Sequence, residues 1–204
     1  MKSNQPRVLL ISGSPRKAAT YRAIQEAEKI LSNMEIETEI LSLHGMKFNF
    51  CLDCGACLKK NSIECVVHHD DMTGWATKFL TYDGYIIASP VYDTNITGQL
   101  QTFFNRMRSN WLLLENNPHY YAKKYGGAIA VGGTRYGGQE LVLNAINNYY
   151  LSLGIKVVSG GPYAYVGAGV WSKDGGAAGV EADLEGMDSV RALAKAVALA
   201  VGGY

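Results

Sequence analysis

The chain has 204 residues, of which 48% are hydrophobic and 18% charged, so it can bury one substantial core and is not disordered in composition. A net charge of +1 gives no strong field that would favour nucleic acid or an anionic membrane as a partner. The sequence shows no secretory signal and no apolar run long enough to span a bilayer. We therefore expect a cytoplasmic protein, in which thiols stay reduced.

Short apolar runs alternate with stretches of helical periodicity along the chain. We expect five strands, at residues 7–13, 36–43, 84–90, 126–133 and 155–161. We expect helices at residues 20–31, 71–82, 97–114, 138–154 and 180–203. This alternation predicts an α/β fold with a doubly wound, five-stranded parallel sheet in the flavodoxin-like arrangement. Residues 1–204 are expected to form a single domain, with a cysteine-rich loop, residues 47–69, inserted after the second strand.

The first strand ends in a loop, Ser12 to Thr20, that leads directly into a helix. Backbone N–H groups point outward at such a junction, and the helix dipole favours an anion there. Ser12, Ser14 and Thr20 add hydroxyl donors, and Arg16 adds a guanidinium that suits phosphate geometry. The loop matches neither the P-loop nor the GxGxxG fingerprint, and a capped helix after a tight turn is the simpler alternative.

Two further loops follow the third and fourth strands, at the edge where such a sheet binds its ligand. In the first of them, Pro90, Val91 and Tyr92 could lie against a flat heterocycle. Four glycines in the second loop would allow close approach of the backbone: Gly132, Gly133, Gly137 and Gly138. Turn chemistry could account for each loop alone, but three loops on one edge suggest a planar, monophosphorylated ligand.

All four cysteines lie in one window of fifteen residues: Cys51, Cys54, Cys57 and Cys65. Two successive two-residue gaps let thiolates converge on an iron–sulfur cluster, as in ferredoxins. Zinc is the main alternative, although structural zinc sites usually use two separated pairs of ligands; His68 or His69 could then replace a thiolate. A disulfide is disfavoured in a protein without a secretory signal.

The chain resembles the iron–sulfur flavoproteins, a branch of the flavodoxin-like NAD(P)H-dependent FMN reductases. The resemblance covers nearly the whole chain and rests on four motifs: SGSPRK, CLDCGACLKKNSIEC with DDM after it, ASPVY…GQL and VGGTRYGGQE. It implies FMN at the strand ends and a [4Fe–4S] cluster close to it. It also implies a homodimer or homotetramer whose interface completes the flavin site.

Carried over by position, the resemblance assigns three groups of FMN-binding residues. The phosphate loop would comprise Ser12, Ser14, Arg16 and Thr20. The flavin ring and ribityl chain would be lined by Pro90, Val91, Tyr92 and Asn95. The other wall would comprise Gly132, Gly133, Thr134, Gly138, Gln139 and Glu140. The cluster ligands would be Cys51, Cys54, Cys57 and Cys65. Many relatives are rich in Gly or Asn after SPRK, whereas this chain has AAT, which leaves donation there to Thr20 and the backbone.

The resulting hypothesis is an FMN-dependent electron-transfer flavoenzyme that couples one-electron and two-electron steps and needs no catalytic acid, base or nucleophile of its own. Its electron donor would be NAD(P)H or a ferredoxin-like protein, and its acceptor a small molecule. Two alternatives remain: an NAD(P)H-dependent FMN or quinone reductase without a cluster, and a redox sensor or electron carrier.

Two further features carry expectations. Arg135 could tune the flavin potential, or it could be an ordinary solvated loop charge. The Gly-rich, aromatic segment Ser159–Gly179 is expected to be irregular, and its centre, Tyr163 to Trp171, is expected to pack on a neighbouring subunit near a flavin. In the helix at 138–154, one face is expected to carry the apolar residues Leu141, Ala145, Ile146, Tyr149 and Leu153.

Overall fold

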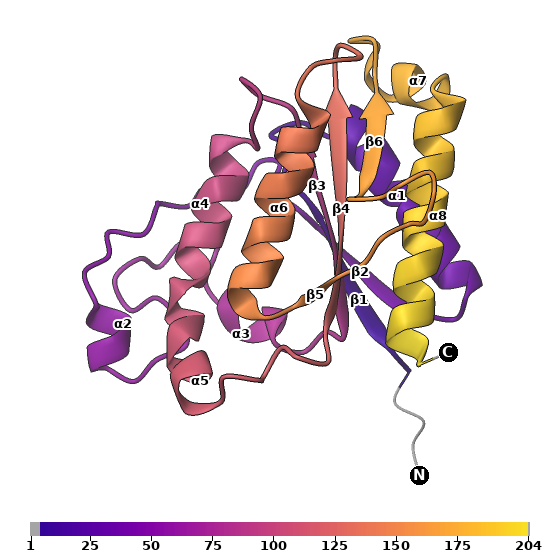
Figure 1. Ribbon diagram of the computed structural model, residues 1–204. Helices are drawn as coiled ribbons and strands as arrows, with labels where there is room; N and C mark the ends of the chain where they lie inside the picture. Colours follow the sequence, from indigo (N-terminus) through magenta and orange to yellow (C-terminus); the bar gives the residue numbers. More distant parts are fainter. Residues whose placement is uncertain (1–4, 204) are drawn as a thin grey trace.

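A central parallel sheet organises the computed structural model, which describes residues 5–203 (Figure 1). Within these residues the strands are β1 (Arg7–Ser12), β2 (Glu37–Ser42), β3 (Gly84–Pro90), β4 (Tyr125–Gly132), β5 (Lys156–Val157) and β6 (Ala168–Trp171). The strand order is β2-β1-β3-β4-β5, and β6 also pairs with β4. This is the predicted doubly wound arrangement, with its single reversal of strand order beside β1.

Helices cover both faces of the sheet (Figure 1). They are α1 (Ala19–Asn33), α2 (Ala56–Lys59), α3 (Trp75–Phe79), α4 (Gly98–Arg106), the 3-10 helix η1 (Met107–Asn110), α5 (Trp111–Asn116), α6 (Gln139–Leu153), α7 (Gly176–Glu181) and α8 (Leu184–Gly202). The α1 and α8 helices pack side by side on one face, and α4 and α6 cover the other. Among residues 5–203, no helix is long and apolar enough to cross a bilayer.

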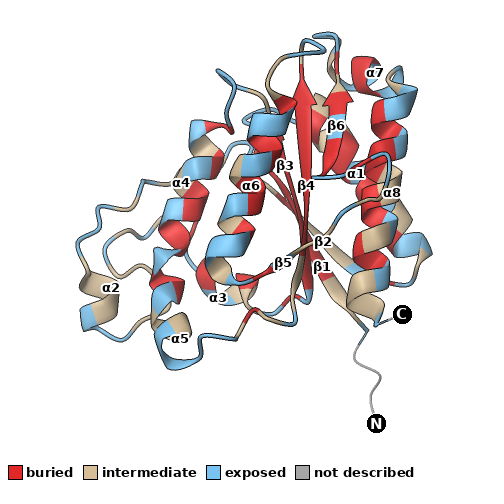
Figure 2. Ribbon diagram, viewed as in Figure 1, coloured by how far each residue is buried: buried red, intermediate tan, exposed pale blue. Residues whose placement is uncertain are grey.

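Two apolar cores lie on the two faces of the sheet, and β1, β3 and β4 are buried almost throughout, whereas β2 at the edge is mostly half-buried (Figure 2). In β1, Leu9 and Ile11 enter the core beneath α4 and α6, whereas Val8 and Leu10 enter the core beneath α1 and α8. This alternation follows from the two-residue period of a strand. Because both faces are covered, the strand reads as a continuous apolar run in the sequence, which is why it could be recognised.

The fifth strand position differs from the prediction. Of residues 155–161, only Lys156 and Val157 pair with the start of β4. The chain then leaves the sheet and returns as β6, which pairs with Ile129–Gly132 near the end of β4. The segment that we expected to be irregular therefore contains a strand. Its sequence is AGVW, and Ala168 and Gly169 are residue types that are uncommon in strands, so the sequence did not predict this strand.

Two long predicted helices are each interrupted. The helix expected at 97–114 bends through η1 between α4 and α5. The closing helix is divided at Ala182 and Asp183 into α7 and α8. The second break has a visible cause, because an Asp183 carboxylate oxygen accepts a hydrogen bond from the Trp171 amide at 2.7 Å and ties the junction to β6.

The buried face of α6 also differs from the expected one. Leu141 is 55% exposed, while Ala145, Tyr149 and Leu153 are only half-buried at the border of the core. The buried face comprises Gln139, Val142, Leu143, Ile146, Asn147 and Tyr150. Apolar residues occur all round this helix, so periodicity alone did not identify the side that meets the sheet.

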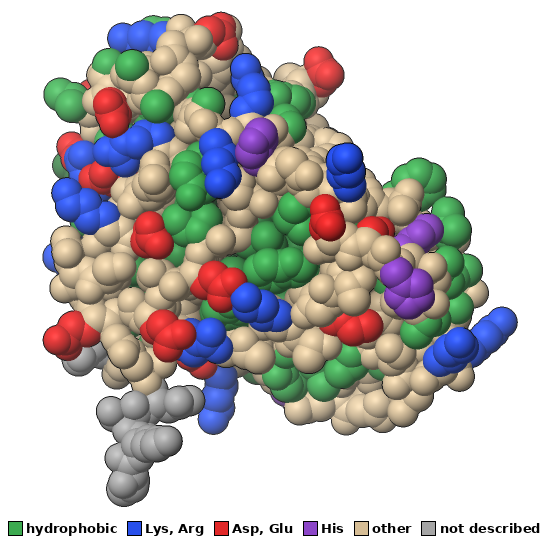
Figure 3. Space-filling view, turned by 180° about the vertical axis from the view of Figure 1, so that it is seen from behind, with side chains coloured by type: hydrophobic (Ala, Val, Ile, Leu, Met, Phe, Trp, Pro, Cys, Tyr) green, Lys and Arg blue, Asp and Glu red, His purple; other side chains and the backbone are tan. Residues whose placement is uncertain are grey.

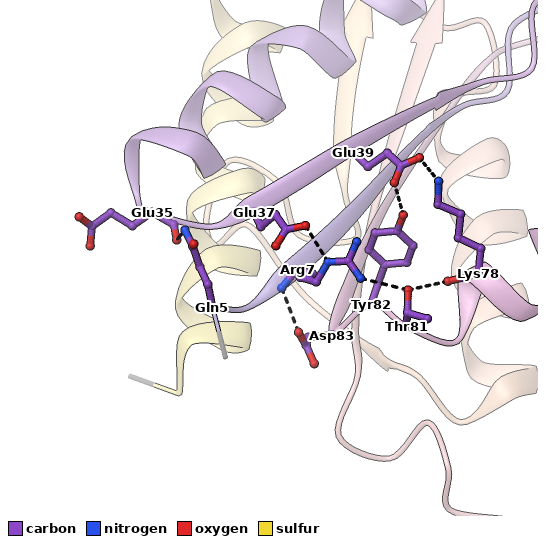
Figure 4. A network of polar contacts seen from close by, with 9 residues as sticks. All are labelled: Gln5, Arg7, Glu35, Glu37, Glu39, Lys78, Thr81, Tyr82 and Asp83. Atoms are coloured by element: carbon purple, nitrogen blue, oxygen red, sulfur yellow. Dashed lines mark hydrogen bonds and ion pairs between the residues drawn. The ribbon is translucent and has the colours of Figure 1, made fainter. Parts of the chain in front are cut away.

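Polar contacts join β1 and β2 at the end of the sheet opposite the loops described below (Figure 4). Arg7 Nε donates to Glu37 Oε1 at 2.8 Å, and the Tyr82 hydroxyl donates to Glu39 Oε2 at 2.5 Å. Lys78 also pairs with Glu39. On the face drawn in Figure 3, acidic and basic side chains are mixed, so that face does not present a surface of one charge sign.

Candidate functional site

The loop after β1 is held against β2, β3 and α4. The Gly13 amide donates to Ala88 O at 2.8 Å, and the Leu43 amide donates to Ser12 O at 3.0 Å. The Thr97 hydroxyl, at the start of α4, donates to Gly13 O at 2.6 Å. Hydrogen bonds from three elements thus hold this loop in one conformation at the carboxyl end of the sheet.

The Ser12 hydroxyl and the first N–H groups of α1 have no side-chain or capping partner in the described residues. Ser12 is fully buried, and within residues 5–203 its hydroxyl makes no hydrogen bond. The α1 helix begins after Ala18 without a side-chain cap, so its first N–H groups are open to a ligand. Ser14 Oγ accepts from the Arg16 amide at 3.1 Å, and Thr20 is buried in the first helical turn. A buried hydroxyl normally has a partner, so these groups fit the phosphate of a bound ligand.

The second loop leaves β3 at Pro90 and forms a tight turn. The amides of Tyr92 and Asn95 each donate to the carbonyl oxygen of the other residue at 2.9 Å. The Val91 amide donates to a carbonyl of β4 at 2.9 Å, so the start of this loop lies beside the third loop. The Tyr92 side chain is 41% exposed and can present its ring to a ligand.

The third loop is shaped by Gln139. Its Nε2 donates to Thr134 O at 2.7 Å and its Oε1 accepts from the Gly137 amide at 3.0 Å. Gly138 has a φ of 101°, and a Cβ there would lie 3.1 Å from Thr94 Cα in the second loop. The loops after β3 and β4 are therefore in contact, and the Gln139 side chain holds the shape of its own loop.

The remaining predicted residues of this loop have different environments. A Cβ on Gly132 would lie 2.3 Å from Gln139 Nε2, so a side chain there would displace that amide. Gly133 O accepts from Trp171 Nε1 at 2.8 Å, whereas Thr134 and Glu140 are exposed.

Arg135 stacks on a ring of β6. Its guanidinium carbon lies 4.6 Å from the centroid of Trp171, and Lys173 Nζ lies 4.7 Å from the same centroid. Cation–π contact of this kind fixes where the arginine charge sits. The effect of Arg135 on a flavin potential stays a prediction.

The four cysteines line a single cavity of about 30 Å³. All four are free thiols, and all belong to the loop between β2 and α3 that carries α2 (Figure 1). The same cavity is lined by His68 from this loop and by Arg106, Arg108 and Ser109 from α4 and η1. The four cysteines therefore lie around one cavity, and their role as cluster ligands stays a prediction.

Backbone amides donate toward two of these thiols. The Asp53 amide lies 3.4 Å from Cys51 Sγ, and the His68 amide lies 3.4 Å from Cys65 Sγ. Within residues 5–203, no three His, Cys, Asp or Glu side chains are grouped closely enough to hold a metal ion. The thiols thus line a shared space, and two of them accept from backbone N–H groups.

A buried ion pair between Arg106 and Asp70, called the clasp below, links the two ends of the cysteine loop. Arg106 donates to both carboxylate oxygens of Asp70 at 2.7 and 3.1 Å and to Asn49 O at 2.9 Å. The side chains of Arg106 and Asp70 are 3% and 10% exposed. Burial opposes ionisation of Asp70, but hydrogen bonds from Arg106 and from the Asn49 and Met72 amides outweigh it and lower the pKa of Asp70 to about 2.

Local sequence patterns did not predict that Arg106 and Ser109 lie at the thiol cavity, or that His44 lies beside the first loop. His44 Nδ1 lies 2.7 Å from Pro15 O. The two α4–η1 residues are separated from the cysteines by more than forty positions in the sequence, and only folding brings them to the cavity. One signal was available, since Arg106 lies on an otherwise apolar helical face beside Phe103 and Met107.

The parallel sheet, with three converging loops at its carboxyl edge, defines the flavodoxin-like class of FMN-binding proteins. The family model described as NADPH-dependent FMN reductase matches residues 6–169. An iron–sulfur flavoprotein of Methanocaldococcus jannaschii is 41% identical over 91% of this chain and 91% of its own length. One of Archaeoglobus fulgidus is 38% identical over 91% of this chain and 92% of its own.

Solved structures share the fold at lower identity. RosB with a bound intermediate superimposes with a TM-score of 0.73 and 17% identity, covering 97% of this chain and 79% of that one. A WrbA-like flavodoxin of Agrobacterium tumefaciens gives 0.66 and 14%, covering 98% and 99%. The chain belongs to the NADPH-dependent FMN reductase family and, within it, to the iron–sulfur flavoproteins. It is an FMN-dependent oxidoreductase.

Proposed function

We propose that this protein is an electron-transfer flavoenzyme that holds a [4Fe–4S] cluster beside its FMN. The observation that carries the proposal is the cavity lined by all four thiols, in a chain of a flavoprotein family. When bound, the cluster would supply one-electron transfer, while FMN can exchange one or two electrons. The contribution of the chain is to bind and orient the two groups and to limit the access of water.

The cluster would be ligated by Cys51, Cys54, Cys57 and Cys65. A structural zinc site usually takes its ligands from two separated pairs. The four thiols here come from one loop and line one cavity, with amide donors to the sulfurs of Cys51 and Cys65. Such donors are a common feature of iron–sulfur sites, where they stabilise the negative charge of the sulfur atoms.

The FMN phosphate would bind at the first loop, where the buried Ser12 hydroxyl and the uncapped start of α1 offer donors. Ser14, Arg16 and Thr20 belong to the same loop and first helical turn. The ring and ribityl chain would be lined from the second loop by Pro90, Val91, Tyr92 and Asn95. The third loop would supply Gly132, Gly133, Thr134, Gly138 and Glu140, with Gln139 holding its shape.

The family description favours NADPH as an electron donor. A ferredoxin-like protein is the second donor that we propose, because a cluster accepts electrons singly. The acceptor would be a small molecule. A reductase of the same fold without a cluster is the competing function, and it is favoured by the wider family description alone.

The test is a metal, sulfide and flavin analysis of anaerobically purified protein. We expect about four iron and four sulfide atoms and one FMN per chain. Cys57→Ser should lose most of the iron and sulfide yet keep FMN, because the flavin loops lie on other elements. Ser62→Ala, in the same loop outside the thiol cavity, is the control and should keep both groups. FMN with zinc or without inorganic sulfide would contradict the cluster and leave the plain reductase.

A further inference from the structure

The thiol cavity has a second wall that contains no cysteine. The cysteine loop supplies most of its lining, but Arg106, Arg108 and Ser109 close it from the end of α4 and from η1. A salt bridge joins the two walls at the rim, with Arg108 Nε 2.7 Å from Asp53 Oδ1. Both of these side chains are more than half exposed, so this pair contributes little stability.

Buried polar atoms without partners gather at this cavity. Within residues 5–203, Arg106 Nε, Ser109 Oγ and His68 Nε2 are buried and make no hydrogen bond. Arg106 and Ser109 are only 5% and 2% exposed as residues. An unsatisfied buried donor costs about 1–3 kcal/mol, and more when it is charged, so several in one place indicate an acceptor that the protein binds there.

The geometry of Arg106 leaves one nitrogen for such an acceptor. Its two terminal nitrogens are committed to Asp70 and to Asn49 O, which fixes the plane of the guanidinium. Nε is the donor that remains. A bidentate arginine–carboxylate pair is rigid, so the free N–H is held in place before any ligand arrives.

The second possible donor is the Ser109 hydroxyl, which the 3-10 helix η1 places at the cavity. The helix expected to continue through residue 114 changes to a 3-10 helix at Met107. Ser109 lies within this segment and is buried at the cavity. A 3-10 segment in the middle of a helix is common at functional positions, because it redirects side chains.

We propose that Arg106 Nε and Ser109 Oγ donate hydrogen bonds to the anionic cluster from the α4–η1 side and raise its reduction potential. This inference rests on the proposed function, because the cluster is the acceptor. Arg106 and Ser109 would contact the cluster through these hydrogen bonds alone, without bonding to iron. One electron makes the cluster one unit more negative without breaking a bond, and hydrogen-bond donors stabilise the more negative state.

The test compares the cluster potential in four versions of the full-length protein. Ser109→Ala removes one donor without changing charge or the Asp70 clasp. Arg106→Gln removes the charge, the free N–H and the clasp. Lys59→Gln is the matched control, because it removes the same charge from an exposed position of the cysteine loop that does not line the cavity. Anaerobic titration with a chemical reductant, followed by electron paramagnetic resonance, reports the cluster directly and independently of turnover.

We expect the equilibrium constant for reduction to fall about threefold in Ser109→Ala and about tenfold in Arg106→Gln, the latter equal to ~59 mV for one electron. Lys59→Gln should change it less than twofold, since solvent and salt screen that charge. If Arg106→Gln does not retain a cluster, the reduction potential of Ser109→Ala alone tests the inference. An unchanged potential in Ser109→Ala, with a cluster present, overturns the inference and leaves the proposed function standing.

The free energy of unfolding of the cluster-free variants tells whether Ser109 donates to the cluster or only packs in the core. Ser109→Ala should not lower the free energy of unfolding without a cluster, because its hydroxyl then has no protein partner to lose. A loss of stability equal to that of Arg106→Gln would assign Ser109 a structural role instead. Absence of iron and sulfide from the wild-type protein would overturn both the proposed function and this inference.

Discussion

Asp70 shows how one residue connects folding to the site. Its carboxylate accepts from the Arg106 guanidinium and from the Asn49 and Met72 amides. These bonds join the two ends of the cysteine loop to each other and to α4. Breaking one partner of such a buried pair leaves an uncompensated charge, which usually costs about 3–5 kcal/mol.

A dependence of stability on pH follows from this arrangement. The pKa of Asp70 is lowered from 3.8 to about 2, so its contribution is complete above pH 4 and is lost as pH falls toward 2. The shift corresponds to about 2 kcal/mol. Chemical denaturation of cluster-free protein at pH 6 and at pH 2.5 should show a stability gap between wild type and Asp70→Asn that shrinks in acid.

A neighbouring carboxylate provides the comparison. Asp71 is exposed and accepts from the Lys47 amide at 2.7 Å, a bond that an asparagine oxygen can also accept. Asp71→Asn should therefore remain close to wild type at both pH values. A gap between wild type and Asp70→Asn that stays constant down to pH 2.5 would rule out titration of Asp70 as its source.

At the scale of elements, the loops at the sheet edge depend on one another. The start of α6 touches the second loop through Gly138 and Thr94, and the start of α4 holds the first loop through Thr97 and Gly13. A change in one loop is thus transmitted to the others through backbone contacts. Because of this coupling, we expect substitutions of residues that do not touch the ligand to change the affinity of the flavin site.

The two glycines that flank α6 offer a matched test. Gly138 and Gly154 have φ values of 101° and 80°, but a Cβ on Gly154 would meet nothing within 4 Å. Gly154→Ala should cost about 1 kcal/mol of stability through backbone strain alone. Gly138→Ala adds a tight contact with Thr94, which must move by a few tenths of an ångström, and should also weaken FMN binding about tenfold or more, measured by flavin fluorescence titration. Equal FMN affinity in the two variants would contradict the coupling of the loops.

At the scale of the whole molecule, large aromatic side chains remain uncovered. Tyr163 and Tyr165 are 82% and 75% exposed in the chain between β5 and β6. Tyr163 borders a depression of about 550 Å³ that is also lined by Arg135 of the third loop and Trp171 of β6. Exposed apolar surface next to a ligand site favours an interface. We propose that a second copy of the chain covers it, in a homodimer or homotetramer.

Replacement of these tyrosines should weaken the oligomer. A Tyr163→Ser, Tyr165→Ser double variant should shift the mass measured by light scattering toward the monomer at micromolar concentration, because each large aromatic buries apolar area in the interface. Leu151→Ser, which alters a 62% exposed apolar residue at the other end of α6, should not. A monomeric wild-type protein with bound FMN would contradict the proposed oligomer.

Prediction from sequence succeeded where local pattern and tertiary environment agree. β1, β3 and β4 are buried on both faces, so their apolar runs are continuous, and turn residues follow each of them. It failed where a segment depends on distant partners. β6 is a strand because β4 offers an unpaired edge beyond β5, and the α7–α8 break depends on the Trp171 amide.

The sequence alone determined which residues are available to bind the two predicted cofactors. The four cysteines lie on one short loop, and the three ligand loops follow strands whose order local patterns predict, so these features needed no long-range contact. Only the tertiary structure decided what faces the thiols. Arg106 reaches Asp70 across 36 positions and Asn49 across 57, and such pairings come from packing, which leaves no periodic signal in a single chain.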